Sequence, residues 1–417
     1  MSLNYFLLIN TTILFVYLYC SRVSHAKLKI DHFLLLCLGM FFYWLMPIYA
    51  YENNLFLTHH VELYENISVL NKKIYLFYVL IIILSMLLGD WISKGLSSTF
   101  SIQNFYYSKK VLDVFLWIFL GLGIYSGFFM RDIFFTTYDT AGEWPHERGW
   151  FISVCTSLTT LNVIHSLTQI VYKPLKRAKR NLIYLMVFNK YFVTAFIFNA
   201  LMLSTGNRGY IMVFFITIVL IYNEYRGGIK LKYLFLISFL TLIFNGYVAL
   251  LRANNVFSFQ GSIGNIFNEF INVGITLFYH LQDMNYNLFE IPYVFFSKFI
   301  GIIPSIIFPG KFALMVSHHE VDKSVIKFQA TTHNYVELLS NFGLVGTILL
   351  FFFFSIVYNW LKSKKHYAPI YIAISAQLPF FFFRSFYDAT IKHMFEFSIL
   401  LPLIILSVSY FNRKYST

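Results

Sequence analysis

Charged side chains are scarce in this chain of 417 residues, and their scarcity excludes a soluble globule. Only 12% of the residues are charged, whereas 58% are hydrophobic and 21% are aromatic, and the mean hydropathy is +0.64. A soluble domain of this length could not cover so much apolar surface. The composition therefore predicts a protein that lies in a lipid bilayer.

Cysteine and acidic residues are also few. The three cysteines, Cys20, Cys37 and Cys155, all fall within apolar runs, so neither a disulfide framework nor a Cys-x-x-Cys metal site is indicated. The 19 acidic residues against 32 basic ones give a net charge of +13. In a membrane protein, an excess of Lys and Arg usually reflects their enrichment in the loops that face the cytoplasm. We expect no nucleic-acid partner and no cofactor.

The apolar runs have the length of membrane-crossing helices. Runs of roughly 17 to 22 residues suit such helices, whereas membrane strands would show alternating segments of about ten residues. About eleven spans are expected, at 3–20, 30–50, 74–92, 111–130, 151–172, 182–203, 210–222, 233–251, 341–361, 368–383 and 394–411. They predict one all-α polytopic membrane domain over residues 1–417, without a soluble domain or an internal repeat.

The basic loops set the expected orientation. Lys and Arg concentrate in every second connection, at 21–29, 93–110, 173–181, 224–232 and 362–367, and in the C-terminal tail. Because these residues favour the cytoplasmic side, the N-terminus is predicted to be periplasmic and the C-terminus cytoplasmic. Positive charges follow the first apolar run instead of preceding it, so we expect that run to remain as a span.

The longest stretch without a plain span, residues 252–340, is then an extracytoplasmic loop. Helical apolar spacing marks Phe267 to Leu281, and an apolar stretch from Ile291 to Phe308 is interrupted by prolines. Non-helical backbone survives at membrane depth only against protein or a wet cavity. Interfacial or re-entrant helices are therefore expected in this loop.

Three arginines stand at the predicted outer ends of spans. Arg208 lies in the turn TGNRG, and Arg252 and Arg384 each follow a predicted span directly. Each can be an interface anchor whose long side chain reaches the headgroups. Alternatively, the three guanidinium groups converge on one anionic ligand, together with backbone amides of the glycine-containing turn. The sequence leaves both interpretations open.

A histidine and a carboxylate stand one helical turn apart shortly before a predicted span. His333 and Glu337 can belong to a polar helix start, with Thr331 or Thr332 as the cap. Alternatively, His333 is a general base whose pKa lies near neutral and which accepts a proton from a hydroxyl group. Glu337 and Asp388 are the reserve candidates for that role.

Three other polar features have simpler alternatives. The run HHE at 318–320 has no further ligand at a diagnostic spacing, so no metal site is predicted. Lys190 is expected near the middle of the span 182–203, where a charge is costly and marks a functional candidate unless it snorkels or pairs with another helix. Polar residues along 153–169 favour interhelical hydrogen bonding over a substrate path.

Three motifs carry a resemblance to a known family. TGNRG after a span, IPSIIFPGK in the long loop and HNYVELLSNFGLVG at its end together resemble the Wzy-type O-antigen polymerases, an oligosaccharide repeat unit polymerase family. The similarity covers these short motifs and the architecture of the whole chain. It implies a GT-C-type polymerase and ligase architecture in the bacterial inner membrane. The related O-antigen ligase shares the general plan.

The resemblance implies a glycosyltransferase. A growing glycan would leave its undecaprenyl diphosphate carrier and join the terminal sugar hydroxyl of a new lipid-linked repeat unit at the periplasmic face. The three arginines would stabilise the leaving diphosphate without a metal ion, and His333 would take the acceptor proton. One base without a paired nucleophile favours an inverting displacement. Membrane lipid and a chain-length regulator are the further partners implied.

Two alternatives to a polymerase stay open. An O-antigen ligase differs in its acceptor alone. A transporter or flippase of lipid-linked oligosaccharide belongs to another class, and such proteins favour repeated halves and broken helices. The sequence shows no duplication of halves.

Overall fold

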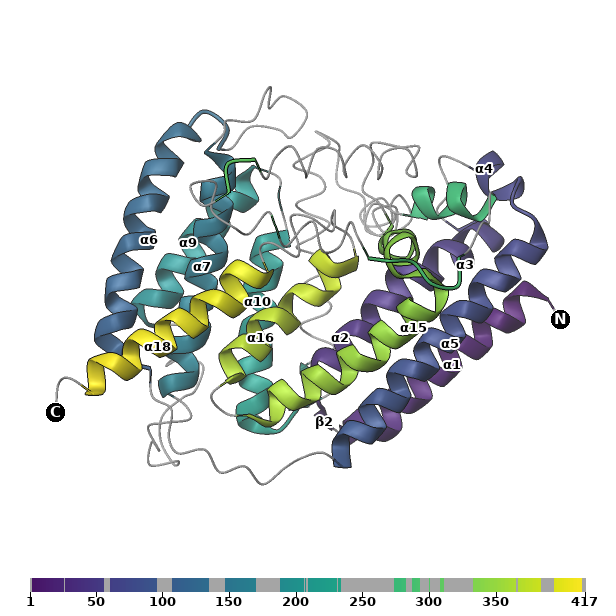
Figure 1. Ribbon diagram of the computed structural model, residues 1–417, viewed down its shortest axis with the longest axis horizontal. Coiled ribbons are helices and arrows are strands. Elements are labelled where there is room, and N and C mark those ends of the chain that lie inside the picture. The colour runs from purple at the N-terminus through teal and green to yellow at the C-terminus, as the bar shows by residue number, and fades with distance from the viewer. Residues whose placement is uncertain are drawn as a thin grey trace.

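The computed structural model is a bundle of long helices (Figure 1). It describes residues 2–25, 27–55, 61–95, 107–134, 147–169, 188–205, 207, 209–230, 232–233, 274–282, 287–292, 300, 308–310, 333–364, 367–383 and 394–414.

Seven of the described helical stretches are long and apolar enough to cross a membrane. They are Leu3–Arg22, His32–Glu52, Val69–Ser93, Lys109–Phe129, Arg148–Leu167, Asn334–Ser363 and Met394–Asn412. The prediction of an all-α polytopic membrane protein is confirmed at this level, and all seven overlap predicted spans. The predicted span at 233–251 lies almost wholly outside the described residues, and so does most of the loop 252–340.

The helices that form the bundle keep their labels from Figure 1. The longer ones are α1 (Leu3–Arg22), α5 (Val69–Gly95), α6 (Lys109–Phe129), α7 (Arg148–Leu167), α9 (Lys190–Ser204), α10 (Gly209–Arg226), α15 (Asn334–Ser363), α16 (Ala368–Gln377) and α18 (Leu401–Lys414). The second span is one run of α2 (His32–Gly39), the π-helical η1 (Met40–Leu45) and α3 (Met46–Glu52). The π-helical segment η4 (Leu378–Phe382) follows α16, η5 (Met394–Leu400) precedes α18, and the short α4 (Val61–Glu65) precedes α5.

Helices α5 and α15 pack in parallel along most of their length. The Ser85 hydroxyl of α5 donates to the carbonyl of Ile348 at 3.1 Å. One turn further on, a Cβ atom at Gly89 would lie 2.5 Å from the carbonyl oxygen of Phe352, so this approach requires glycine. Both helices therefore run from the end of the bundle where α15 begins, called here the His333 end, to the end where α1 stops, called the Arg22 end. The predicted alternation of spans requires the same parallel arrangement.

A small antiparallel sheet closes the Arg22 end. Strands β1 (Val23–Ser24), β2 (Lys27–Leu28) and β3 (Ile229–Lys230) pair in that order. The sheet is a departure from the all-α prediction. It brings together two loops that the basic-residue pattern assigns to the same side of the membrane.

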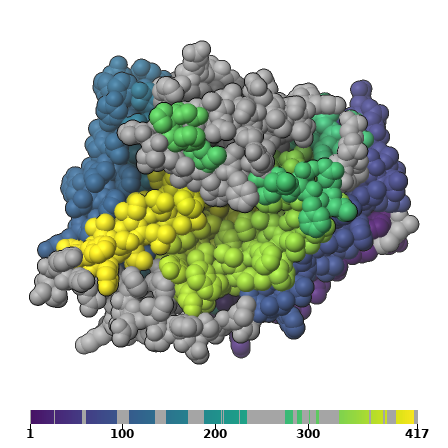
Figure 2. Space-filling view, viewed as in Figure 1, coloured from purple at the N-terminus to yellow at the C-terminus, as the bar shows by residue number. Residues whose placement is uncertain are grey.

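Two apolar clusters fill the bundle. One is built around α2, α5 and α15, and the other around α6, α7 and α9. In Figure 1, α1 and α5 lie on one side, α6 and α9 on the other, with α2, α10, α15 and α16 between them. On the face shown in Figure 2, the yellow C-terminal segment lies beside the light-green α16, which contacts η5. Large apolar side chains also point outward, among them Leu8, Trp117 and Phe128, as expected for lipid-facing surface.

Candidate functional site

His333 is the N-cap of α15. Its backbone is extended (φ −68°, ψ 124°), and its Nδ1 accepts a hydrogen bond from the backbone N–H of Tyr335 at 3.2 Å. The helix begins at Asn334, seven residues before the predicted span at 341–361. The expected polar helix start is therefore present, but the described cap is His333 itself, because its side chain satisfies an amide at the helix start. Thr331 and Thr332 lie outside the described residues.

Both ring nitrogens of His333 have backbone partners. Nε2 lies 2.8 Å from the carbonyl oxygen of Tyr43, which can only accept, so Nε2 carries the proton. The backbone N–H of His333 donates to the Thr276 hydroxyl at 2.8 Å. The side chain is fully buried, and this burial lowers the pKa of His333 to about 4 despite the hydrogen bond to Tyr43. The ring is therefore a neutral imidazole whose one lone pair, on Nδ1, faces the amide of Tyr335.

Two π-helical segments fasten the start of α15. The carbonyl of Tyr43, in η1, accepts from His333, and the carbonyl of Phe382, in η4, accepts from the side-chain amide of Asn334. A π-helical turn interrupts the regular α-helical hydrogen bonding, and such turns are frequent at functional sites. Here they supply backbone acceptors to the first turn of α15.

Glu337 lies one turn after His333, as the sequence predicts, and it is buried at 1% exposure. Its backbone carbonyl accepts from Asn341 at 2.8 Å and from Ser340 at 3.0 Å. A carboxylate in the first turns of a helix is stabilised by the free N–H groups and the dipole at that end. The structure thus places a buried histidine and a buried carboxylate together at the His333 end of α15.

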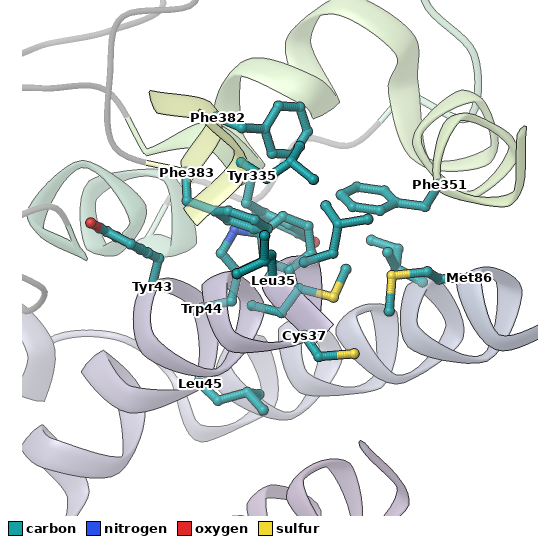
Figure 3. Packing of buried hydrophobic residues seen from close by; sticks show 14 of the residues in the cluster. Leu35, Cys37, Tyr43, Trp44, Leu45, Met86, Tyr335, Phe351, Phe382 and Phe383 are labelled. Carbon is teal, nitrogen blue, oxygen red and sulfur yellow. The ribbon is translucent and has the colours of Figure 1, made fainter. Parts of the chain in front are cut away.

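An aromatic cluster packs beneath this helix start (Figure 3). The Trp44 ring contacts Tyr335, Phe351 and Phe383 edge to face, with ring centroids 5.4, 5.5 and 5.8 Å apart. The Tyr75 hydroxyl donates to the Trp44 carbonyl at 2.9 Å, another acceptor supplied by η1. This packing fixes α15 against the second span and excludes water from the side of the site that faces the bundle.

Helix α15 is broken at Gly343, which has φ +67°. The N–H groups of Leu344 and Val345 bond to the carbonyls of Asn287 and Leu288, at 3.1 and 3.0 Å, instead of to the preceding turn. A Cβ atom at Gly343 would lie 2.8 Å from the carbonyl oxygen of Asn287. A short segment of the long loop is therefore docked by its backbone into the break of the helix that carries His333 and Glu337.

The polar face of α7 lies inside the bundle. Most of its hydroxyls donate to their own helix, as Thr156 does to the Ile152 carbonyl at 3.1 Å. The expected interhelical bonding occurs where Asn199 of α9 donates to Thr159 at 3.1 Å. These side chains, with Thr217 of α10, line a small cavity. The volume within which the centre of a water molecule can lie is about 10 Å³. That is room for about one water and not for a sugar.

Lys190 does not lie in the middle of a span. It is the first residue of α9, after Asn189, whose side chain caps the helix by accepting from the N–H of Phe192 at 2.8 Å. Its ammonium group lies 2.7 Å from the carboxylate of Asp113 on α6 and is about half exposed, at 48%. The prediction of a mid-span charge was wrong, and Lys190 joins two helices near their ends.

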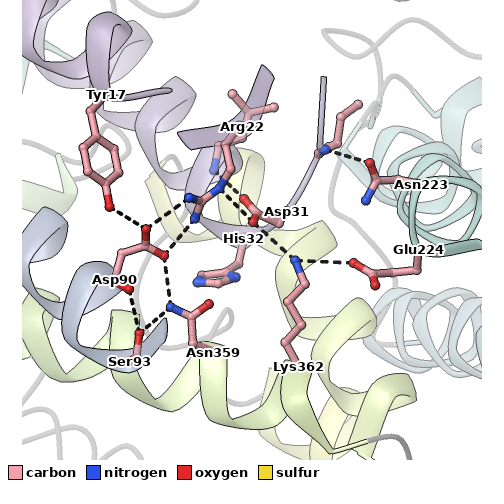
Figure 4. A network of polar contacts seen from close by, with 12 residues as sticks. Tyr17, Arg22, Asp31, His32, Asp90, Ser93, Asn223, Glu224, Asn359 and Lys362 are labelled. Carbon is pink, nitrogen blue, oxygen red and sulfur yellow. Dashed lines mark hydrogen bonds and ion pairs between the residues drawn. The ribbon is translucent and has the colours of Figure 1, made fainter. Parts of the chain in front are cut away.

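A network of charged side chains, most of them buried, occupies the Arg22 end (Figure 4). Arg22 holds Asp90 through two hydrogen bonds, of 2.8 and 3.1 Å, and its Nε donates to Asp31 at 3.0 Å. Lys362 lies 3.3 Å from Asp31 and 3.4 Å from Glu224. These five residues belong to α1, α5, α10, α15 and the N-cap of α2, so the network ties five helices together.

Asp31 shows how the network balances burial with charge. Burial alone would raise the pKa of this carboxyl, but the neighbouring Lys362 and Arg22 lower the pKa to about 2. Neither the apolar pattern nor the short motifs of the sequence predict this network. Its signal was Asp90 within the predicted span 74–92, because an acid at membrane depth is costly and is usually paired.

Four of the six predicted site residues lie outside the described residues. They are Arg208, Arg252, Arg384 and Asp388. Their roles in binding diphosphate or accepting a proton stay predictions. The described members, His333 and Glu337, lie at the end of the bundle where α9 ends and α10 begins, and there Thr205 is buried.

Among the described residues, no group of three His, Cys, Asp or Glu side chains is placed to hold a metal ion. The run at 318–320 lies outside those residues. No protein-family model matches the chain, and no curated protein or solved structure matches it either.

Proposed function

We propose that the chain is a glycosyltransferase that polymerises undecaprenyl-diphosphate-linked oligosaccharide repeat units at the periplasmic face of the bacterial inner membrane. The observation that carries the proposal is the pair His333 and Glu337, buried one turn apart at the start of a membrane helix. A substrate with a polyprenyl tail needs an enzyme whose reacting groups lie at the end of membrane helices, because the tail stays in the hydrocarbon layer.

The reaction needs a base and a stabiliser of negative charge. The acceptor hydroxyl attacks the anomeric carbon, its proton passes to the base, and the bond from that carbon to the diphosphate oxygen breaks. His333 is the first candidate for the base, and it would accept the proton on Nδ1 after its 3.2 Å bond from Tyr335 opens. Glu337 and Asp388 are the reserves. The predicted arginines stabilise the departing diphosphate, in an inverting and metal-independent displacement.

Lipopolysaccharide from cells that depend on this chain for O-antigen tests the proposal. His333→Gln keeps a hydrogen-bond donor that can reach the Tyr43 carbonyl, and Glu337→Gln keeps the shape of the side chain. At normal membrane levels, we expect His333→Gln and Arg208→Ala to leave lipopolysaccharide with a single repeat unit and no ladder. Glu337→Gln should shorten the ladder. Preserved ladders in all three variants would contradict the site assignment.

One observation keeps a transporter as the second candidate. Transporters of lipid-linked sugars commonly use broken helices, and α15 is broken at Gly343. Purified chain in vesicles, supplied with lipid-linked repeat units on the His333 face alone, separates the two functions. A polymerase makes polymer from these units, whereas a transporter moves them without joining them. A ligase would transfer the glycan only when a lipid A core acceptor is added.

A further inference from the structure

The small sheet at the Arg22 end places lysines side by side. In the pairing of β2 with β3, Lys27 stands directly opposite Lys230, and Leu28 stands opposite Ile229. Gly227 and Gly228, both at positive φ, form the turn that brings β3 into this register. Like charges directly opposite each other destabilise a strand pair. The register is therefore favourable only if something offsets the repulsion between the two ammonium groups.

Among the described residues, the two facing lysines have no carboxylate partner. The Lys27 ammonium donates to the backbone carbonyl of Arg226 at 3.5 Å, and Lys230 is exposed. Lys29 and Lys232 lie within two residues of the ends of β2 and β3 and are also exposed. Within the described part of the chain, the ion pairs at this end belong to Arg22 and Lys362, and none includes these four lysines. The pKa of Lys29 is lowered, chiefly by the charge of Lys362 and then by burial, although the carboxylates of Asp31 and Glu224 act in the opposite direction. Lys29 therefore still has an excess of positive charge around it.

The sheet lies at the depth of the lipid headgroups. Strand β1 follows the last residue of α1 directly, and β3 begins within three residues of the end of α10. Two tryptophans near the same ends of neighbouring helices are exposed, Trp91 at 69% and Trp360 at 49%. Exposed tryptophans at helix ends mark the membrane–water interface. The lysines of the sheet therefore stand at the level where phospholipid phosphates lie.

We propose that a basic cluster, formed by Lys27 and Lys230 of the sheet and by Lys29 and Lys232 beside it, binds the phosphate headgroups of anionic phospholipids in the leaflet at the Arg22 end. A loop that only directs topology needs lysines in sufficient number, without a fixed arrangement. Here backbone pairing fixes two of them opposite each other, and a lipid phosphate between them turns their repulsion into a shared attraction. The site is at the opposite end from His333 and does not rest on the proposed function.

Native mass spectrometry of the full chain in a neutral detergent tests the proposal. The probe is phosphatidylglycerol, and phosphatidylcholine of the same acyl chains is the zwitterionic reference. We expect the wild-type chain to retain phosphatidylglycerol preferentially. Lys27→Gln with Lys230→Gln should weaken phosphatidylglycerol binding by roughly fivefold for each lysine lost. Binding of phosphatidylcholine should not change.

Two matched variants make the test specific. Lys27→Arg with Lys230→Arg keeps both charges and should keep the preference. Lys109→Gln with Lys110→Gln removes two exposed lysines from the start of α6, at the same end of the bundle, and should leave binding unchanged. An equal loss in this control would overturn the site, because net charge alone would then explain the binding. Displacement of the lipid by millimolar inorganic phosphate would overturn the assignment to a lipid in favour of free phosphate.

Discussion

The two ends of the bundle solve the burial of polar groups in opposite ways. At the Arg22 end, charged side chains neutralise one another, as Arg22 and Lys362 do with Asp31, Asp90 and Glu224. At the His333 end, the described cap is held by neutral groups: backbone carbonyls, an amide and a hydroxyl.

The two ends differ in how much free energy it costs to open their contacts. A charge pair buried in a membrane protein is costly to open, because each partner would be left unpaired in a medium of low dielectric. A bond from a backbone amide to an imidazole nitrogen is much weaker and can open during a reaction. The Arg22 end is therefore suited to hold the helices in place, whereas the cap at the His333 end can rearrange at a lower cost, as the proposed reaction requires.

Removal of Arg22 should have the largest effect. Arg22→Met leaves Asp90 and Asp31 without their main partner, and the loss of one member of a buried charge network costs about 3–5 kcal/mol. We expect a large drop in the unfolding midpoint of the purified chain in detergent. Lys29→Gln removes an exposed charge from the same loop and should change the midpoint little.

A double variant sharpens the result. Arg22→Met with Asp90→Asn removes both members of the strongest pair, so part of the lost stability should return. If Arg22→Met is no more destabilising than Lys29→Gln, the network does not hold the helices, and the contrast between the two ends fails.

The second effect is a difference in acid response. His333 has its pKa lowered from 6.5 to about 4, so stability from this group is complete above about pH 6.5 and declines as the pH falls towards 4. Asp31 has its pKa lowered from 3.8 to about 2, so its contribution is complete above about pH 4 and is lost only between pH 4 and 2. The contributions of these two residues should therefore be lost in separate pH windows.

Unfolding midpoints measured from pH 7 to pH 2.5 check this expectation. His333→Gln should make the decline between pH 6.5 and 4 smaller, the remainder coming from other buried histidines such as His280, whose pKa burial lowers to about 4. Asp31→Asn should instead reduce the decline between pH 4 and 2. A wild-type midpoint that stays constant between pH 6.5 and 4 would show that His333 titrates as an exposed histidine does.

The smallest effect is expected at the break of α15. Gly343→Ala places a side chain at φ +67°, which costs about 1–2 kcal/mol, and its Cβ meets the carbonyl of Asn287. Hydrogen exchange should report faster exchange at the amides of Leu344 and Val345, because the docked loop segment is pushed away. Gly121→Ala, in α6 with open space around it, is the control and should not slow or speed exchange at those amides. Unchanged protection in Gly343→Ala would mean that the break tolerates a side chain.

The apolar pattern predicted the seven described membrane-length helices, because the length of an apolar run is set directly by the thickness of the bilayer. The start of a helix depends on a single capping side chain, which the pattern does not weigh. Because Asn189 caps α9, that helix begins at Lys190, which was expected in the middle of a span. Because His333 caps α15, that helix begins at Asn334, seven residues before the predicted span. The prediction of a histidine and a carboxylate on one helical turn needed only local spacing, and the structure has that arrangement.

The contacts between distant segments were beyond the sequence pattern. Asp90 pairs with Arg22 across 68 positions and with Asn359 across 269. An acid within an apolar run signals that a partner exists, but only the packed helices identify it. The π-helical carbonyl of Tyr43 that holds His333 gives no signal in composition or periodicity.

The network around Asp90 also bears on the order in which the chain enters the membrane. Asp90 reaches the bilayer while its first partner, Arg22, is already there, because α1 and α2 precede α5 in the chain. Asn359 and Lys362, the other members of the network, belong to α15, which enters the membrane after most of the chain has been synthesised. An acidic side chain therefore need not wait unpaired in lipid during translation, and the early pair leaves a prepared surface on which α15 completes the bundle.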